Sequence, residues 1–285
     1  MKSPALQDAA RYKRLAAEYP NPSCERSFAN LFCYRHEGVG IEFREDRVLI
    51  WQGGDGLWQF PAGKPPTAEE LRKLCPGHSI YDVPPDFQPE GCFEVTCDPG
   101  EADYIYRNDR LAGFTGEKLR KKHNLCRQFE ALCPEWRVET ITEKNLPLAA
   151  QFASDCNRAR GDAGFLAVEN RALHECWEHF FAPELEFSGI LLFAEPGRVA
   201  GFAVISPLAG VPEGMCDVHF EKADHTIKGA PQKLTAALAE AACGRFARMN
   251  REQDMNVPGI RQAKNSLDPE YLWRRRTLVP AGARD

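Results

Sequence analysis

The spacing of apolar residues divides the first part of the chain into helices followed by short strands. Apolar positions recur at helical spacing over residues 5–18 and again after Ser27, a residue type that favours the start of a helix. Turn-forming residues then separate three short strand patterns, at 39–43, 47–51 and 57–60. The pattern predicts a further helix at 68–74 and another strand at 79–83.

The same order of elements recurs in the second part of the chain. We predict helices at 146–157 and 167–181, three strands between 189 and 221, and a helix that ends near Ala242. Each part of the chain thus has helices, then an antiparallel meander, then a strand, a glycine turn and a helix. This order, found twice, is that of two tandem acyl-CoA N-acyltransferase-like (GNAT-like) domains. We therefore expect an α+β or α/β fold in which helices flank two mixed, largely antiparallel sheets. The expected domains are residues 1–140 and 141–285, and the second should carry the active site.

The stretch from 215 to 231 carries the most informative chemistry. Val218 and Phe220 alternate with Asp217, His219 and Glu221. A period of two places alternate residues on opposite faces of a strand. The alternation therefore predicts that the three ionisable side chains share one face.

Lys228 and Gly229 lie directly before the next predicted helix, where Pro231 suits the first turn. A strand, a glycine turn and a helix N-terminus direct free N–H groups at one point, where an anion is stabilised. The alternative is an ordinary turn with no ligand.

A second informative stretch is the helix predicted over 116–133. Five Lys or Arg residues lie between positions 118 and 127 with no carboxylate among them, and the helical spacing places Lys118 and Lys122 in the apolar stripe. One interpretation is a solvated face whose lysine stems follow apolar surface. The other is contact with a polyanion, either a phosphate chain or an RNA backbone.

Composition indicates how large a core the chain can form and in which compartment it is expected. The 285 residues are 43% hydrophobic, enough for two ordinary cores, and the net charge of -5 excludes no partner. The eleven cysteines include no CxxC pair, and the first residues have no apolar signal segment, so we expect reduced thiols and a cytoplasmic protein. No apolar run is long enough to span a membrane.

In the segment from His174 to His179, only Cys176 and His179 share a helical face, so no metal site is expected.

Several short segments together form a recognisable pattern between Ser27-Phe28-Ala29-Asn30 and Pro269. They are Tyr104–Arg107, Gly116–Asn124, His219–Asp224, Ile227–Ala230, Asn250–Asp254 and Gly259–Lys264. This pattern resembles a family of soluble bacterial proteins related to the C-terminal, catalytic domain of phosphatidylglycerol lysyltransferase.

The resemblance implies two fused acyltransferase-like domains, as in the lysyltransferase and the Fem peptidyltransferases. Those enzymes move an aminoacyl group from charged tRNA to a lipid hydroxyl or a peptidoglycan amine. The sequence lacks the membrane-embedded half of the full lysyltransferase, which argues against a lipid acceptor. The turn from His225 to Ala230 keeps only part of the acetyl-CoA-binding pattern, so CoA is possible but not expected, and no cofactor is required.

Acyl transfer needs a base for the proton of the nucleophile and positive groups for the developing oxyanion. We assign the base to His219 and expect Asp217 and Glu221 to keep its pKa near neutrality. Lys228 and Gly229 would hold a phosphate or the oxyanion.

Two further sets of residues complete the expected site. Lys118, Arg120 and Lys122 would contact the backbone of the donor. Residues at the end of a strand would orient an amino group; these are Arg251, Glu252 and Asp254.

The expected function is transfer of an acyl or aminoacyl group, with aminoacyl-tRNA as the favoured donor and a hydroxyl or amine as the acceptor. Two alternatives stay open. The chain could bind tRNA or another anionic ligand without catalysis, or it could be an acyl-CoA-dependent N-acyltransferase for small molecules.

Overall fold

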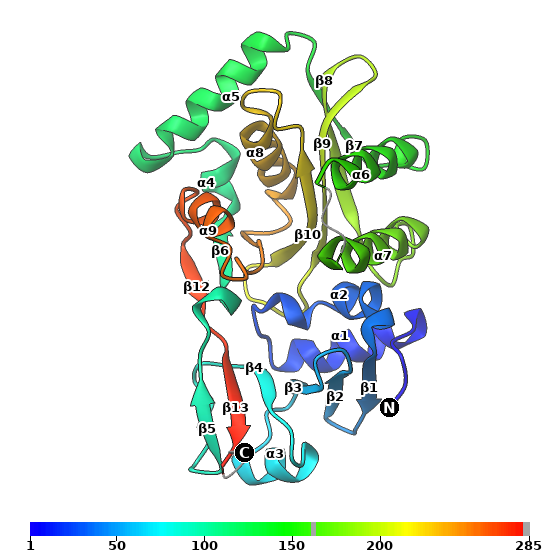
Figure 1. Cartoon of the computed structure of the whole chain (residues 1–285), viewed down its shortest axis with the longest axis vertical. Helices are drawn as coiled ribbons and strands as arrows, with labels where there is room; N and C mark the ends of the chain where they lie inside the picture. The colour runs from blue at the N-terminus through cyan, green and yellow to red at the C-terminus, as the bar shows by residue number, and fades with distance from the viewer. Residues whose placement is uncertain (161–163, 282–285) are drawn as a thin grey trace.

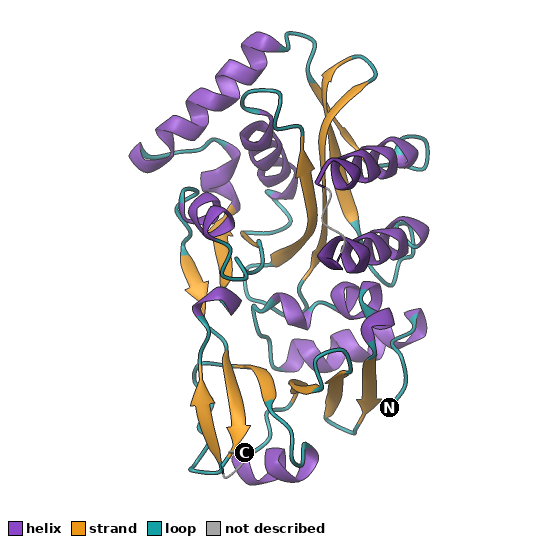
Figure 2. Cartoon of the chain, in the orientation of Figure 1, coloured by secondary structure: helices purple, strands orange, loops and turns teal. Residues whose placement is uncertain are grey.

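The chain folds around two mixed sheets, each flanked by helices (Figures 1 and 2). The computed structural model describes residues 1–160 and 164–281. The strand order is β1-β2-β3-β4-β13-β5 in the six-stranded sheet and β12-β6-β11-β10-β9-β8-β7 in the seven-stranded sheet. Helices α1 and α2 lie between the two sheets (Figure 1).

The six-stranded sheet is built mainly from the first hundred residues. Its strands are β1 (Val39–Phe43), β2 (Arg47–Gln52), β3 (Leu57–Gly63), β4 (Ile80–Val83), β5 (Phe93–Thr96) and β13 (Arg276–Pro280). The accompanying helices are α1 (Ala9–Glu18), α2 (Phe28–Cys33) and α3 (Ala68–Leu74).

The seven-stranded sheet contains most of the remaining chain. Its strands are β6 (Asp103–Arg107), β7 (Arg137–Thr140), β8 (Ser188–Glu195), β9 (Arg198–Pro207), β10 (Met215–Ala223), β11 (Arg248–Asn250) and β12 (Tyr271–Trp273). Its helices are α4 (Asn108–Ala112), α5 (Arg120–Leu132), α6 (Leu146–Arg160), α7 (Gly164–Glu178), α8 (Ala230–Ala242) and α9 (Pro258–Asn265).

Both halves repeat one arrangement, which confirms the expected tandem GNAT-like fold. In each, two helices precede an antiparallel meander of three strands, and a helix then crosses over to a parallel strand. The crossover units are β3–α3–β4 and β10–α8–β11, whose outer strands pair in parallel. Parallel pairing requires such a crossover because a tight turn can only join antiparallel strands.

The predicted domain boundary at residue 140 does not coincide with the division of the strands between the two sheets. β6, α4 and α5 all precede residue 140 but belong with the seven-stranded sheet, while β13 returns to the six-stranded sheet. The short strands β5, β12 and β13 gave no clear periodicity in the sequence. Pairing between distant strands therefore decides which sheet each segment joins.

The seven-stranded sheet has a core on each face. On one face, α8 and α5 pack against alternate residues of β8, β9 and β10, including Ile205 and Val218. On the other face, α6 and α7 pack against Val204 and Phe220. These two layers hold β10, the strand with the ionisable residues, in the middle of the fold (Figure 1).

Gly229 has a packing role at the start of α8. Its backbone is left-handed, with φ +85°, and a Cβ there would lie 2.1 Å from the carbonyl oxygen of Leu125 in α5. Only glycine allows this close approach. The glycine before α8 is therefore explained by the contact between α5 and α8.

Gly229→Ala should destabilise the protein more than Gly244→Ala. Gly244 has nearly the same φ, +86°, but open space where its Cβ would lie. Both variants carry the left-handed penalty of about 1–2 kcal/mol, and only the first adds overlap with backbone. Denaturant unfolding should give a free-energy loss at Gly229 of about 3 kcal/mol or more. Equal losses at both positions would contradict the packing role.

Among the described residues, no helix combines the length and apolar character needed to cross a bilayer.

Candidate active site

A β-bulge in β10 decides which side chains of the central strand meet. The register with β9 pairs Asp217 with Ser206 and Val218 with Ile205, then shifts before Phe220. An extra residue in one strand reverses the facing of the later residues in that strand. His219 is the inserted residue, and the bulge separates Asp217 from Glu221.

Glu221 consequently lies on the α8 face, away from His219, and the predicted row of three on one face is wrong. Its carboxylate pairs with Arg251, with Nη2 and Oε2 2.8 Å apart, and accepts a hydrogen bond from Thr235 of α8. Arg251 also donates to Thr235. Glu221 and Arg251 thus form a bridge between the strand end and α8.

Asn30 joins the remaining ionisable groups. Its Oδ1 accepts from Nδ1 of His219 at 2.8 Å, and its Nδ2 lies 3.2 Å from Oδ2 of Asp217 and 3.3 Å from Oε1 of Glu252. The same nitrogen lies 3.2 Å from the carbonyl oxygen of Cys24. One amide from α2 therefore contacts β10 and the segment after β11, across the junction between the two sheets.

His219 is held as a neutral imidazole. Its Nε2 accepts from the Ser206 hydroxyl at 2.7 Å, while Nδ1–H donates to Asn30. Burial lowers the pKa of His219 to about 3, because a charged ring would lose its hydration. The expectation of a near-neutral pKa is therefore wrong, although Asp217 lies 3.5 Å from Nδ1.

Asp217 and Glu252 are the perturbed acids of the site. Burial, and then the charge of Glu252, raises the pKa of Asp217 well above its usual value. Burial also raises the pKa of Glu252 to about 7. Asp217 is completely enclosed, whereas Glu252 and Asn30 are partly exposed. The site is therefore an acidic pair with one member reachable from solvent.

More charges lie behind this pair. Asp103 accepts from the backbone N–H of Cys24 and from Asn250, and Glu25 pairs with Arg275 at 3.2 Å. Burial raises the pKa of Glu25 as well. The guanidinium of Arg275, which pairs with Glu25, also lies 3.9 Å from the carboxylate of Asp103. One arginine therefore serves two carboxylates at the junction of the sheets.

Lys264 of α9 supplies the other cation. Its ammonium donates to the carbonyl oxygen of Arg251, next to Glu252 in the chain. Burial lowers the pKa of Lys264 to about 8, and the charge of Glu252 opposes that shift. Lys264 and Glu252 thus influence one another electrostatically.

Asp254 has a structural role in holding the segment after β11. It accepts from Tyr104 at 2.7 Å and receives two hydrogen bonds from Arg261, at 2.7 and 2.9 Å. Hydrogen bonding from Arg261 is the main reason that its pKa is lowered. Glu252, two residues earlier, has a left-handed φ of 56°. Such strain persists only where the surroundings fix it, as these contacts do.

The predicted anion-binding residues lie outside this cluster. Lys228 is exposed at the turn before α8, and Arg120 is exposed at the start of α5. Lys118 is also exposed and pairs with Asp268 at 2.9 Å, so its predicted inward position is wrong. Lys122 is half-buried, and burial lowers its pKa.

Among the residues that the structure describes, two groups of side chains have the composition of a metal site. Ligand atoms of Asp217, His219 and Glu252 lie within 4.8 Å of one another, as do those of the second group, Glu175, Glu178 and His179. In the first group, the Asn30 amide already contacts all three side chains, and the raised carboxyl pKa values favour bound protons over a cation. In the second, Glu175 pairs with Arg35 and His36.

A model of the C-terminal part of phosphatidylglycerol lysyltransferase matches residues 16–276. The chain belongs to this family. A search of curated proteins gives no match.

The solved structures agree on the fold of this family member. A conserved protein of unknown function from Bacteroides thetaiotaomicron has a TM-score of 0.86 and 23% identity, with 98% of each chain covered. L-PGS from Bacillus licheniformis has a TM-score of 0.67 and 12% identity, with 99% of this chain and 94% of that one covered. FemX has a TM-score of 0.66 and 9% identity, covering 95% and 96%. The family member therefore has an aminoacyltransferase-like fold, as the sequence resemblance implied.

Sequence reasoning missed several members of the site. Asn30 was part of the family pattern but had no assigned role, although it is the one strongly polar residue in the apolar run Phe28–Cys33. Ser206, Asp103 and Lys264 are far apart in the sequence and meet only through strand pairing and the docking of α9. Asn30 and Lys264 both lie in segments of the family pattern, whereas Ser206 and Asp103 needed the fold.

Asn30→Ala should cost this family member about 2 kcal/mol or more of folding free energy, because it removes the shared partner of His219, Asp217 and Glu252. Asn124→Ala, at an exposed position of α5, is the matched control and should change stability little. Chemical denaturation of both variants measures the difference. An Asn30 variant as stable as the control would contradict the bridging role of this amide.

The raised pKa of Glu252 also predicts a pH dependence of stability. The folded state holds this proton up to about pH 7, whereas an unfolded glutamate loses it near pH 4. The folded state therefore binds more protons in that window, and the free energy of unfolding should fall as pH rises from about 4 to 7. Glu252→Gln should reduce this fall in denaturation curves recorded across the range. Parallel curves for the two proteins would mean that the pKa is not raised.

Proposed function

We propose that the protein transfers an aminoacyl group from aminoacyl-tRNA to a hydroxyl or amine acceptor, and that the reaction takes place at Glu252 and Asp217. The observation that carries the proposal is the acidic pair itself. Glu252, a partly exposed residue whose carboxyl has a pKa of about 7, lies beside the enclosed Asp217, and the Asn30 amide joins them. Perturbed acids of this kind concentrate at functional sites.

The charge of the cluster favours a substrate with an ammonium group. Among the residues that the structure describes, the cluster holds four acidic side chains and two basic ones. The acids are Glu25, Asp103, Asp217 and Glu252, and the bases are Arg275 and Lys264. A bound cation would offset the excess and favour the ionised form of both raised acids. The α-ammonium of an aminoacyl ester is such a cation.

Glu252 is the proposed proton acceptor. As the nucleophile attacks the ester carbonyl, its proton passes to Glu252, the acyl–oxygen bond to the donor breaks, and the released ribose oxygen takes up a proton. A base with a pKa near the working pH is well matched to this step. His219, whose pKa is far lower, would position Asn30 instead.

The wider set of sequence-based site residues takes different roles in this proposal. Glu221, Arg251 and Asp254 would hold the strand end and the segment that carries Glu252. The packing of Gly229 against α5 explains that glycine without a CoA pyrophosphate, so acyl-CoA remains the second choice of donor.

Glu252→Gln should lower transfer from labelled aminoacyl-tRNA by about a hundredfold or more, because it removes the base and keeps the shape of the side chain. In the unaltered protein, kcat/KM should rise with pH and level off above about 7, and the variant should lose this limb. The control is Glu270→Gln, in a carboxylate that pairs with Arg248 outside the cluster. It should stay within about twofold of the unaltered protein.

Two results would contradict the assignment. The first is full activity of the Glu252 variant. The second is an unaltered protein that is stabilised by acyl-CoA but not by charged tRNA in thermal unfolding, because a ligand stabilises the fold it binds.

A further inference from the structure

The solvent face of α5 carries an isolated concentration of positive charge. Arg120, His123 and Arg127 recur at i, i+3 and i+7 on the exposed side, while Cys126 and Phe129 face inward. Arg120 and Arg127 are about 10 Å apart along the helix axis. Figure 1 shows α5 at the end of the molecule farthest from α3.

These cations are not used in holding the fold together. Arg120, Lys121, Lys122 and Arg127 make no ion pair with any residue in the described ranges 1–160 and 164–281. The carboxylate that follows them in α5, Glu130, pairs with Lys233 of α8. Four cations in two turns repel one another, and they lie near the positive end of the helix dipole. A bound polyanion would relieve both costs.

Lys228 extends this surface onto α8. Gly229 lies against the carbonyl oxygen of Leu125, so Lys228, the exposed residue before it, lies near the middle of α5. Lys121, one turn before Leu125, is on the same flank of the helix. The two stretches that the sequence marked separately therefore form one surface, which we call the α5 ridge: Arg120, Lys121, Lys122, His123, Arg127 and Lys228.

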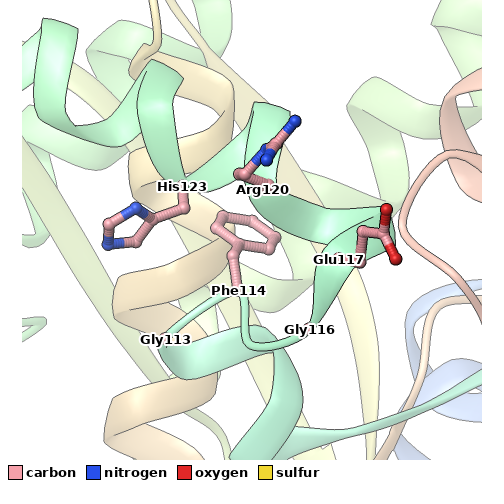
Figure 3. Close-up of a pocket in the computed structure, with 6 residues that line it drawn as sticks. All are labelled: Gly113, Phe114, Gly116, Glu117, Arg120 and His123. Carbon is pink, nitrogen blue, oxygen red and sulfur yellow. The ribbon is translucent and has the colours of Figure 1, made fainter.

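A hollow opens at the N-terminal end of the ridge (Figure 3). Its volume is about 440 Å³, and it is lined by Gly113, Phe114, Gly116, Glu117, Arg120 and His123. The ring of Phe114 lies between the side chains of Arg120 and His123 (Figure 3). Phe114 has a left-handed φ of 44°, a conformation in which a bulky residue is strained. Phe114 is itself buried and belongs to the core on the α8 face. The surfaces that the hollow offers to a ligand are therefore the planar side chains of Arg120 and His123.

We propose that the α5 ridge binds the phosphodiester backbone of a structured RNA and that the hollow receives one unpaired nucleotide of it. The cations from Arg120 to Arg127 extend about 10 Å along α5, a length over which they can contact successive phosphates of one RNA strand. Aromatic rings, histidines and guanidinium planes are the surfaces on which unpaired RNA bases stack. The inference rests on the proposed function, because this RNA would be the part of the aminoacyl-tRNA that lies outside the acidic site.

RNA fits this surface better than an anionic membrane does. An interfacial helix turns its apolar face toward the lipid. In α5 that face packs against α8, through Cys126 and Phe129, and the exposed side carries the cations. Leu132 is the exposed large apolar residue of α5, at its far end.

The test measures binding of deacylated tRNA by fluorescence anisotropy at several salt concentrations. The ridge variant is Arg120→Gln with Lys121→Gln and Arg127→Gln. The charge-matched control is Lys64→Gln with Arg72→Gln and Lys73→Gln, exposed residues in and before α3. The ridge variant should weaken binding at least tenfold and reduce the slope of log K against log salt by about 2 to 3, and the control should change neither.

A second control lies just before the ridge, in the turn that precedes α5. Lys118→Gln removes a cation that Asp268 already neutralises, so the salt slope should stay unchanged. His123→Ala, which removes an exposed planar side chain from the hollow, should weaken RNA binding without altering the slope. Equal slopes for the ridge variant and the unaltered protein would overturn the proposal, and so would binding to vesicles of anionic phosphatidylglycerol but not to tRNA.

Transfer assays separate this inference from the proposed function. The ridge variant should raise KM for intact aminoacyl-tRNA but leave transfer from a short aminoacyl-nucleotide ester unchanged. If the slope changes while neither protein transfers from either donor, the ridge stands and the transferase proposal fails. If transfer from both donors is normal in the ridge variant, the ridge proposal fails and the transferase proposal stands.

Discussion

The junction between the two sheets depends on one side-chain amide. Asn30 is held in place because Ser27 caps α2, accepting a hydrogen bond from the Asn30 backbone N–H, and because the rest of α2 is buried. From there it contacts His219, Asp217 and Glu252, which come from the last quarter of the chain. An amide can accept from the ring and donate to carboxylates at the same time, which neither an ionised carboxylate nor an ammonium group could do. Asn30 of α2 therefore decides which of these groups donates a hydrogen bond and which accepts one.

The bulge in β10 is the second constraint. Without it, regular alternation would put Asp217, His219 and Glu221 together, as the sequence suggested. With it, Glu221 is free to bridge Arg251 and Thr235 on the α8 face, and the acidic pair forms on the other face with Glu252. The charges of one strand are thus divided between a structural bridge and a candidate site.

The limits of sequence reasoning follow from these contacts. Strong local periods gave the meanders, the crossover helices and the tandem fold, because each depends on neighbours within a few residues. The one-residue bulge at His219 could not be predicted from the sequence. Polar and apolar residues alternate from Asp217 to Glu221 whether or not the strand is bulged there. The pKa of His219 was misjudged for a related reason: enclosure by Phe187 and its neighbours outweighs the nearby carboxylate. Asn30, Asp103 and Lys264 are brought together by pairing and docking across almost the whole chain.

The position of β13 has a consequence for how the protein is made. This strand pairs with β4 on one side and β5 on the other, inside the six-stranded sheet. Residues 276–280 are therefore needed before β5 can join a sheet whose other strands were translated much earlier. During synthesis on the ribosome, the six-stranded sheet must wait with an open edge while the strands of the seven-stranded sheet emerge and can already begin to pair. The sheet that starts first is completed last.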